Sequence, residues 1–277
     1  MKRACVIGWP IEHSRSPIIH NYWLKTLGIE GAYTREPVKP DELKSFLQSL
    51  GDRGFSGCNV TVPHKEAALV VAAERDASAE AIGAANTLWL DGGRLCASNT
   101  DAYGYMTYLQ KCAPRWAERD APVVVLGAGG AARAIVYGFL DAGVSRVTLC
   151  NRSRDRSEDL ARHFGSRVEV RDWSSRNAAV ADAGVIVNTT TLGMKEAGDP
   201  GIDFALARSD AVVSDIVYVP LETTFLASAR AHGLTTVDGL GMLLHQAVPG
   251  FEKWFGARPQ VTDDLYNRVR ADIEGAV

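Results

Sequence analysis

Residues 58–65 place polar side chains at alternating positions, in the order Cys-Asn-Val-Thr-Val-Pro-His-Lys. Side chains on a β-strand point to opposite faces with a period of two. If the path stays extended, Asn59, Thr61 and Lys65 share one face, and the apolar side chains share the other. The segment is therefore expected to present an amide, a hydroxyl and an amine to a polar partner.

The same pattern also fits a half-exposed edge strand whose polar face contacts only water. Pro63 cannot donate to a sheet ladder and tends to lie at the edge or the end of a strand. We therefore expect the strand to cover residues 57–62 and to stop there. Other parts of the chain decide between a solvated edge and the floor of a polar site.

A glycine-rich loop follows an apolar segment, residues 123–126, and reads Gly127-Ala-Gly-Gly-Ala-Ala-Arg133. It fits the dinucleotide-binding fingerprint, with small residues where the turn, the pyrophosphate and the helix packing require them. A lone match of this kind also arises by chance, but here a strand-like segment precedes it and an apolar helix follows. We expect the backbone of four residues to contact the pyrophosphate: Gly127, Gly129, Gly130 and Ala131.

The next strand-like segment ends in Asn151-Arg152-Ser153, where an NAD enzyme would carry an acidic residue for the ribose 2′-hydroxyl. A carboxylate would repel a 2′-phosphate, whereas the guanidinium groups of Arg152 and Arg156 can bind it through charge-assisted hydrogen bonds. The alternative is a solvated basic turn at the start of a helix, and Asp155 weakens the case for a phosphate site. On balance the segment predicts NADP rather than NAD as cofactor.

The composition is that of an ordinary globular protein, with 46% hydrophobic and 23% charged residues among 277. The formal net charge is -3 at pH 7 and no basic cluster stands out, so neither nucleic acid nor an anionic membrane is expected as a partner. No apolar run is long enough to span a bilayer, and the first residues lack the apolar core of a signal peptide. We therefore expect a cytoplasmic protein.

Cysteine and histidine usage indicates neither disulfides nor a metal site. The five cysteines are scattered and contain no Cys-x-x-Cys pair, which favours free thiols in a reducing compartment. The six histidines lack the spacing of metal ligands, so no metal is expected. His13, His20 and His64 lie close in sequence to the candidate residues and are interpreted as structural.

Strand-like and helix-like stretches alternate almost throughout, which predicts an α/β fold with largely parallel sheets. A first series has strands at 4–8, 32–38 and 57–62, helices at 16–28 and 40–50, and a hairpin that joins 87–90 to 94–97. A second series has strands at 123–126, 146–151, 185–188 and 212–216, with two helices from about residue 240. The stretch between residues 101 and 122 is expected to join two domains.

Taken together, these motifs resemble those of the shikimate dehydrogenase family over essentially the whole chain. The motifs are Gly8-Trp-Pro-Ile-Glu-His-Ser14-Arg-Ser16-Pro17, Asn59-Val-Thr61-Val-Pro-His-Lys65, Ala84-Ala-Asn86-Thr87, Asn99-Thr-Asp101, the Gly127 loop with Asn151-Arg152, and Asp238-Gly-Leu-Gly-Met242-Leu-Leu-His-Gln246-Ala. Trp9, where the family commonly has asparagine, is a departure that leaves both serines in place.

The resemblance implies the NADP-dependent interconversion of 3-dehydroshikimate and shikimate in aromatic amino-acid (chorismate) biosynthesis. It also implies two α/β domains separated by a cleft. Residues 1–101 with 245–277 would bind the substrate and carry catalysis, and residues 102–244 would form a Rossmann-type, doubly wound NADP domain. The C-terminal helices would then return to the first domain, a return that periodicity does not show.

The resemblance further implies roles for single residues. Lys65 would be the general acid/base and Asp101 its partner; because the carboxylate favours a charged amine and burial a neutral one, the protonation state of the lysine stays open. Ser14 and Ser16 would bind the substrate carboxylate, unless they only cap the helix that begins nearby. The ring hydroxyls would be bound by Asn59, Thr61, Asn86 and Gln246, with Tyr218 at the mouth of the cleft. The cofactor would also contact Ser153, Thr189, Thr190, Ile216, Gly239 and Met242.

Several alternatives stay open at this point. Asn86 could be an ordinary turn residue, Met242 simple core, and the Lys65–Asp101 pair an interdomain salt bridge. A quinate or dual quinate/shikimate dehydrogenase would need room for an extra hydroxyl and often tolerates NAD. A catalytically silent NADP-binding regulatory protein would have lost the polar residues facing the cleft, which are present here. Whether the chain is a monomer or a homodimer is not readable.

Overall fold

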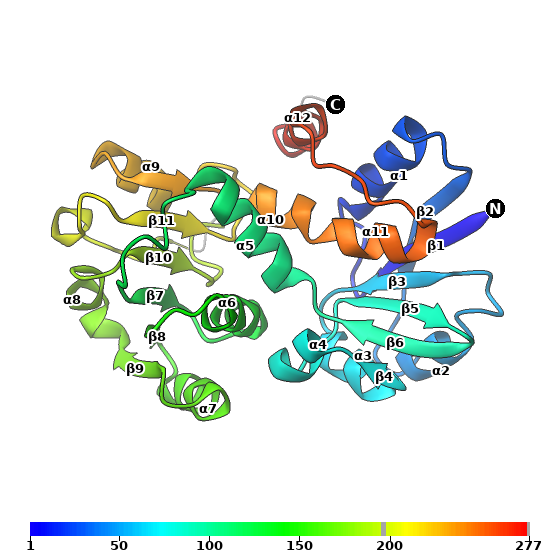
Figure 1. The fold of residues 1–277 in the computed structure, drawn as a ribbon, viewed down its shortest axis with the longest axis horizontal. Coiled ribbons are helices and arrows are strands. Elements are labelled where there is room, and N and C mark those ends of the chain that lie inside the picture. Colours follow the sequence, from blue (N-terminus) through cyan, green and yellow to red (C-terminus); the bar gives the residue numbers. More distant parts are fainter. Residues whose placement is uncertain (195–197, 276–277) are drawn as a thin grey trace. The chain divides into compact units, whose positions relative to one another are not determined.

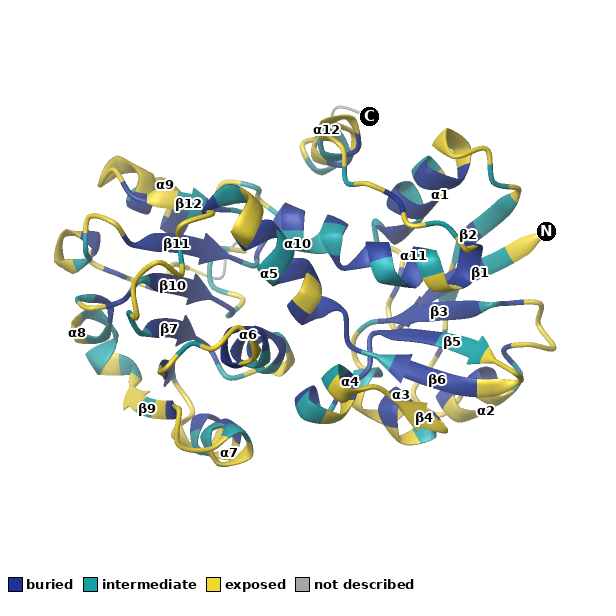
Figure 2. Ribbon diagram, in the orientation of Figure 1, coloured by how far each residue is buried: buried dark blue, intermediate teal, exposed yellow. Residues whose placement is uncertain are grey.

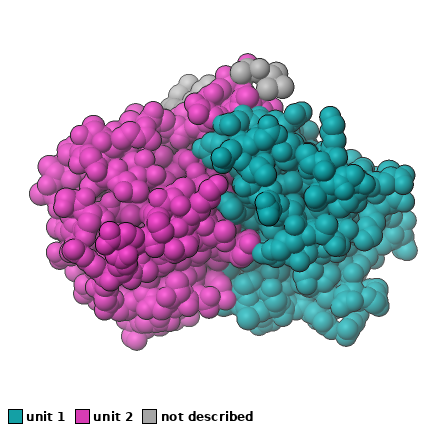
Figure 3. Space-filling view, turned by 45° about the horizontal axis from the view of Figure 1, so that its top comes forward, with its two compact units in different colours: residues 1–101, 244–269 teal, residues 102–243, 270–277 magenta. Residues whose placement is uncertain are grey.

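The computed structural model describes residues 1–194 and 198–275. The chain forms two compact units, residues 1–101 with 244–269 and residues 102–243 with 270–277, which are coloured separately in Figure 3. The expected division kept all of 245–277 with the first unit, whereas from residue 270 onward the chain groups with the second. The binding roles assigned to the two units remain predictions.

The first unit is built on a mixed sheet with the strand order β2-β1-β3-β5-β6-β4 (Figure 1). Its strands are β1 (Lys2–Gly8), β2 (Gly31–Pro37), β3 (Gly57–Val60), β4 (Glu74–Arg75), β5 (Thr87–Asp91) and β6 (Arg94–Ser98). Its helices are α1 (Ser16–Thr26), α2 (Leu43–Gln48), α3 (Lys65–Val71), α4 (Ala77–Ile82) and α11 (Ala247–Phe255), and α12 (Asp263–Ile273) crosses the division. The predicted hairpin is confirmed, because β5 and β6 pair antiparallel around two glycines of positive φ, Gly92 and Gly93.

Strand β3 lies between β1 and β5 in the interior of the sheet, so the interpretation of this segment as a solvated edge is wrong. Asn59 is only 5% exposed. The strand predicted over residues 57–62 ends two residues earlier, at Val60. The path does not stay extended to Lys65, which begins α3. Pro63 cannot extend the sheet ladder, and the N–H of His64 donates to the carbonyl of Thr61 at 3.0 Å, which turns the chain into the helix.

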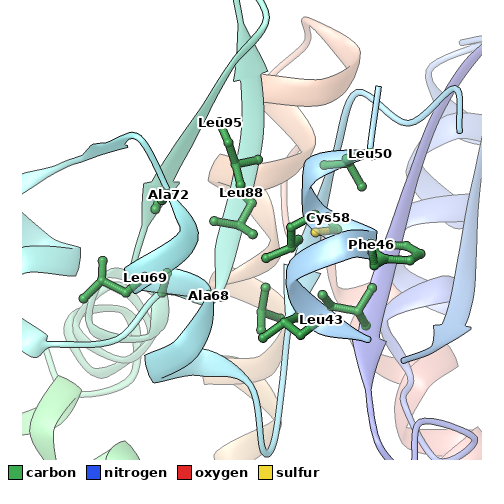
Figure 4. Close-up of a cluster of buried hydrophobic side chains, with 14 of the residues drawn as sticks. Leu43, Phe46, Leu50, Cys58, Ala68, Leu69, Ala72, Leu88 and Leu95 are labelled. Carbon is green, nitrogen blue, oxygen red and sulfur yellow. The ribbon is translucent and has the colours of Figure 1, made fainter. Parts of the chain in front are cut away.

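The alternation of side chains along β3 is confirmed within its shorter span. Cys58 and Val60 belong to a cluster of buried side chains that includes Phe46 of α2, Leu69 of α3 and Leu88 of β5 (Figure 4). Asn59 therefore faces the other side of the sheet, among polar partners. Burying the apolar face fixes which side chains the strand offers to a site.

Helix α11 packs on the sheet of the first unit. The indole Nε1 of Trp254 donates a hydrogen bond to the carbonyl of Leu88 at 2.8 Å. A Cβ atom at Gly57 would collide with that indole, so only glycine lets the helix approach β3 so closely. Residues 244–269 belong to the first unit, so the chain returns to this unit after residue 243.

The second unit has an all-parallel sheet with the strand order β12-β11-β10-β7-β8-β9. Its strands are β7 (Val123–Leu126), β8 (Val147–Asn151), β9 (Val168–Asp172), β10 (Val185–Asn188), β11 (Val212–Asp215) and β12 (Thr235–Val237). Its main helices are α5 (Asp101–Cys112), α6 (Gly130–Asp141), α7 (Arg154–Phe164), α8 (Arg176–Val180), α9 (Thr224–Ala231) and α10 (Gly239–His245). Parallel strands joined by helical crossovers in this order form the predicted Rossmann-type, doubly wound fold.

Burial explains which strands of the second unit could be predicted from the sequence. The central strands β7, β10 and β11 are buried along their whole length, as Figure 2 shows, and they read as apolar or nearly apolar runs. The edge strands β9 and β12 were not predicted, because β9 carries charged residues on an exposed edge and β12 has three residues. The two helices expected from residue 240 are in fact three, α10, α11 and α12.

Candidate active site

A lysine and an aspartate of the first unit form an ion pair at the starts of two helices. Lys65 opens α3 and Asp101 opens α5, and Nζ donates to Oδ2 at 2.5 Å. The side chains are 30% and 12% exposed, respectively. The partial positive charge at a helix N-terminus stabilises the carboxylate of Asp101 but not the ammonium of Lys65. The ion pair with Asp101 is therefore what holds the amine at the start of α3. The amine stays accessible to a ligand.

Asn86 fixes the other oxygen of the same carboxylate. Its Nδ2 donates to Oδ1 of Asp101 at 2.8 Å, and its Oδ1 accepts from the backbone N–H of Thr100 at 2.8 Å. The hydroxyl of Thr87 also donates to Oδ1 of Asn86, at 2.9 Å. Because the amide oxygen accepts from a backbone donor, the orientation of the Asn86 side chain is determined. The residue is thus part of a buried polar network rather than an ordinary turn residue.

Gln246 and Asn59 close this network. The hydroxyl of Thr100 donates to the backbone carbonyl of Gln246 at 2.8 Å, and Nδ2 of Asn86 reaches Oε1 of Gln246 at 3.4 Å. Nδ2 of Asn59 donates to the carbonyl of Asn86 at 3.1 Å and to the hydroxyl of Thr87 at 3.2 Å. Five predicted residues are therefore joined by hydrogen bonds within one unit: Asn59, Lys65, Asn86, Asp101 and Gln246.

Tyr33 is a member of the site that sequence reasoning missed. Its hydroxyl donates to Oδ1 of Asn59 at 2.6 Å. Burial raises the pKa of Tyr33 well above its usual value, so the hydroxyl keeps its proton and remains a donor. A single tyrosine in a predicted strand gives no signal of this role. Thr87 and Thr100 were also missed as site members, although both lie inside the recognised motifs.

The two serines predicted to bind a carboxylate lie at the start of α1. The backbone N–H of Ser16 donates to Oγ of Ser14 at 3.4 Å, and the guanidinium of Arg35 donates to the carbonyl of Ser14 at 2.6 and 2.8 Å. Ser16 is the first helical residue and Arg15 precedes it as cap, so Ser16 does not cap the helix. Thr61 is half-buried, and within the described residues no hydrogen bond joins its hydroxyl to the Asn86 network.

The second unit brings the predicted cofactor residues to the carboxyl edge of its sheet. Gly127 has φ +113°, and a Cβ there would lie 2.5 Å from Oγ1 of Thr189. Gly129 and Gly130, at the start of α6, have no heavy atom within 4 Å of the position of a Cβ. This open space beside a helix N-terminus fits a pyrophosphate, with Ala131 half-buried in the first turn.

The arginines after β8 differ in how far they are already engaged. Arg154 donates to Glu158 and to Asp172, each at 2.7 Å. Arg152 and Arg156 are exposed, and neither forms an ion pair among residues 1–194 and 198–275. Two unpaired guanidinium groups at this position fit the chemistry of a 2′-phosphate. Beside them, Asn151 Nδ2 donates to the carbonyl of Ser153 at 2.8 Å, which shapes the turn into α7.

The remaining cofactor candidates lie at or near the ends of β10 and β11. Oγ1 of Thr189 donates to the carbonyl of Leu126 at 2.8 Å, so this hydroxyl ties the end of β10 to the glycine loop. A Cβ at Gly239 would collide with the carbonyl of Ile216, in the loop after β11. Glycine at this position therefore lets α10 approach the loop after β11. Thr190, Ile216, Tyr218 and Met242 are half-buried. Ligand contacts of all these residues remain predictions.

Three further features of the described residues bear on the class of site. In the described part of the chain, no group of three or more His, Cys, Asp or Glu residues is placed to hold a metal ion. No helix among the described residues is long and apolar enough to cross a membrane. The five cysteines are free, and only Cys112 among them is not fully buried. The candidate chemistry thus rests on the lysine–aspartate pair and the nucleotide-type unit.

A doubly wound unit with a glycine loop, joined to a unit with a lysine–aspartate site, defines a dinucleotide-dependent oxidoreductase. Three family models match the chain: "Shikimate dehydrogenase substrate binding domain" at residues 6–88, "Shikimate / quinate 5-dehydrogenase" at 110–195 and "Shikimate 5'-dehydrogenase C-terminal domain" at 239–263. The chain belongs to the shikimate dehydrogenase family.

Individual relatives agree with this assignment. A shikimate dehydrogenase (NADP(+)) of Brucella abortus is 55% identical over 278 residues, covering 99% of this chain and 96% of the relative. The structure of shikimate 5-dehydrogenase from Thermus thermophilus with NADP(H) and shikimate has a TM-score of 0.86 at 33% identity and covers 100% of both chains. Quinate dehydrogenase from Corynebacterium glutamicum with NAD gives 0.88 at 29% identity, covering 100% of this chain and 99% of that one.

Within residues 1–194 and 198–275, none of the three histidines His13, His20 and His64 forms a hydrogen bond with Lys65 or Asp101. His64 is buried and its Nε2 lies 2.7 Å from the carbonyl of Val38, and His13 is exposed. His20 is fully buried and stacks on Tyr33 with ring centroids 4.0 Å apart. Neither ring nitrogen of His20 has a hydrogen-bond partner in the described part of the chain, and burial lowers the pKa of His20 to about 3.

His20 therefore makes a prediction about stability and pH. Below about pH 6.5 the unfolded chain protonates this histidine while the folded protein does not, so its contribution lowers the free energy of unfolding as pH falls towards 3. Relative to His20→Phe, the wild type should lose about 1.4 kcal/mol per pH unit between pH 6 and pH 4, measured by urea unfolding. Ile19→Val, which changes a buried side chain that cannot titrate, is the control, and the difference between it and the wild type should show no such slope. If the difference in the free energy of unfolding between the wild type and His20→Phe stayed constant with pH, His20 would not be a buried histidine with a lowered pKa.

Proposed function

We propose that this chain is an NADP-dependent oxidoreductase that interconverts 3-dehydroshikimate and shikimate, a step of aromatic amino-acid biosynthesis. The observation that carries the proposal is the hydrogen-bonded chain Lys65–Asp101–Asn86, which offers an accessible amine held by a fixed carboxylate. The 55% identity to a shikimate dehydrogenase (NADP(+)) over nearly the full length supports the same activity. The two free arginines after β8 support NADP as the cofactor.

Oxidation of a secondary alcohol removes a proton from the oxygen and a hydride from the carbon. Bound NADP⁺ supplies the hydride acceptor through its nicotinamide. Lys65 exchanges the proton with the substrate oxygen, and in the reverse direction its ammonium stabilises negative charge that develops there. Asp101 holds Nζ through Oδ2, so the amine meets the oxygen in one geometry and does not have to be ordered during the reaction.

The rest of the first unit supplies recognition of a polyhydroxylated acid. Ser14 and Ser16 bind the carboxylate, with the N-terminus of α1 adding a favourable dipole. Asn59, Thr61, Asn86 and Gln246 contact ring hydroxyls, and Asn59 also keeps Asn86 and Thr87 in place through its own hydrogen bonds. An analogue lacking a hydroxyl would leave a buried polar group unpaired, which gives the site its selectivity.

The second unit holds NADP at the carboxyl edge of its sheet. Backbone groups from Gly127 to Ala131 take the pyrophosphate, and Arg152 and Arg156 take the 2′-phosphate. Tyr218 lies at the mouth of the site. We place the enzyme in the cytoplasm, since its thiols are free and its cofactor is intracellular. Its partners are the small-molecule substrate and NADP.

An NADP-linked oxidation assay tests the substrate. We expect kcat/KM for shikimate with NADP to exceed that for quinate with NAD by about 100-fold or more, because the proposed site is matched to the hydroxyls of shikimate and NAD leaves the arginines unused. Both substrates are assayed with both cofactors. A preference for quinate with NAD would instead identify a quinate dehydrogenase, and absence of turnover with every pair would leave only a binding protein.

Arg152 tests the cofactor. Arg152→Ala should raise the dissociation constant for NADP about tenfold or more and leave that for NAD within about twofold, since only NADP carries the 2′-phosphate. Titration of the folded protein with each cofactor gives both constants. Arg154→Ala is the matched control, because that guanidinium is already held by two carboxylates. Equal weakening of NADP and NAD in Arg152→Ala would mean that the 2′-phosphate is bound elsewhere.

A further inference from the structure

Two buried polar residues connect the loops that follow β10 and β11 in the second unit. Asn188 is the last residue of β10 and Asp215 the last of β11, and neither has exposed surface. Nδ2 of Asn188 donates to Oδ1 of Asp215 at 3.0 Å. The strands pair in parallel with these two residues opposite each other, so the pair sits at the carboxyl edge where such folds bind their ligands.

Asp215 is a buried carboxylate without a cation. Its Oδ1 also accepts from the backbone N–H of Val217 at 3.0 Å, and its Oδ2 accepts from the hydroxyl of Thr223 at 2.8 Å. No lysine or arginine of the described residues pairs with it. Burial raises the pKa of Asp215 to about 6. An apolar residue of similar size would avoid this desolvation cost, so the carboxylate is retained for what it connects.

Asn188 shapes the loop that follows its own strand. Its Oδ1 accepts from the backbone N–H of Thr190 at 3.1 Å and from the hydroxyl of Thr190 at 2.7 Å. Its Nδ2 also donates to the carbonyl of Leu192 at 2.8 Å. One amide therefore fixes residues 190–192 while it also bonds to Asp215.

The pair is linked to the glycine loop on one side and to α9 on the other. Thr189, next to Asn188, ties β10 to the carbonyl of Leu126 directly before Gly127. Thr223, which bonds to Asp215, caps α9 through the N–H of Leu226 at 3.3 Å. The carboxylate thus connects three segments around one edge of the sheet: the loop after β10, the loop after β11 and the start of α9.

We propose that Asp215 is a positioning residue for the cofactor, which together with Asn188 holds the loops after β10 and β11 in the shape that receives NADP. The inference rests on the proposed function, because it takes Thr190 and Ile216, which the family resemblance predicts as cofactor contacts, to bind NADP. Asp215 itself is fully buried and touches the ligand only through these loops. Its removal should therefore weaken NADP binding without touching the substrate residues of the first unit.

The test replaces the carboxylate with an amide of the same shape. Asp215→Asn turns one acceptor atom into a donor. Either the new amide N–H faces the donors of Asn188 and Val217, or the Thr223 hydroxyl has to change from donor to acceptor. We expect the dissociation constant of NADP and its KM to rise about tenfold or more, while KM for shikimate stays within about twofold. Ser214→Ala, at the preceding buried position, is the control. Binding is measured by titration at a temperature where circular dichroism shows the variant fully folded.

The outcomes separate this inference from the function on which it rests. A folded Asp215→Asn variant that melts at lower temperature but binds NADP like the wild type would overturn the positioning role and leave a purely structural one. Failure of the wild type itself to bind NADP would overturn the proposed function instead. Should Asp215→Asn not fold, Thr223→Val removes one of the three donors to Asp215, together with the side-chain cap of α9, and should raise the NADP dissociation constant severalfold. Unchanged affinity in that variant would equally overturn the proposal.

Discussion

The carboxylate of Asp101 is the centre on which the arrangement of the site depends. One oxygen holds the amine of Lys65 and the other is held by the amide of Asn86. The pair is only partly buried, so the two charges avoid most of the desolvation cost of a fully buried ion pair and stay in reach of a ligand. A flexible lysine side chain is thereby limited to one small region, and the entropy of ordering it is lost on folding rather than during the reaction.

The fold of the first unit brings together the carboxylate of Asp101, the amine of Lys65 and the amide of Asn86. Lys65 and Asp101 each begin a helix, and Asn86 directly precedes β5. Gln246 directly precedes α11, so its position depends on how that helix packs on the sheet. Glycine at position 57 allows that packing, because Trp254 occupies the space where a Cβ would lie. The polar site and the apolar packing on β3 are thus set by the same few residues.

Much of the site was predictable because its members belong to short motifs with unusual polarity. Hydrogen bonds join four residues that the motifs assigned to one site, Lys65, Asn86, Asp101 and Gln246. The strand predicted over residues 57–62, however, ends at Val60. The alternation of polar and apolar residues continues from the strand into the turn after it, so the pattern does not show where the strand ends. In the structure, the hydrogen bond from the N–H of His64 to the carbonyl of Thr61 marks that turn. Tyr33 was missed because its partner, Asn59, is distant in sequence. Asp215 was missed because its strand reads as a buried run, where a lone carboxylate carries no motif.

The most direct test of the account is a double-mutant cycle on kcat for shikimate oxidation, with Lys65→Ala, Asp101→Asn and the double variant. Each single change should lower kcat by about 100-fold or more, with NADP affinity nearly unchanged. If Asp101 acts by holding the amine, the double variant should be no slower than the slower single variant, within about threefold. Effects that multiply in the double variant, or normal turnover in Lys65→Ala, would contradict a carboxylate and an amine that act as one unit.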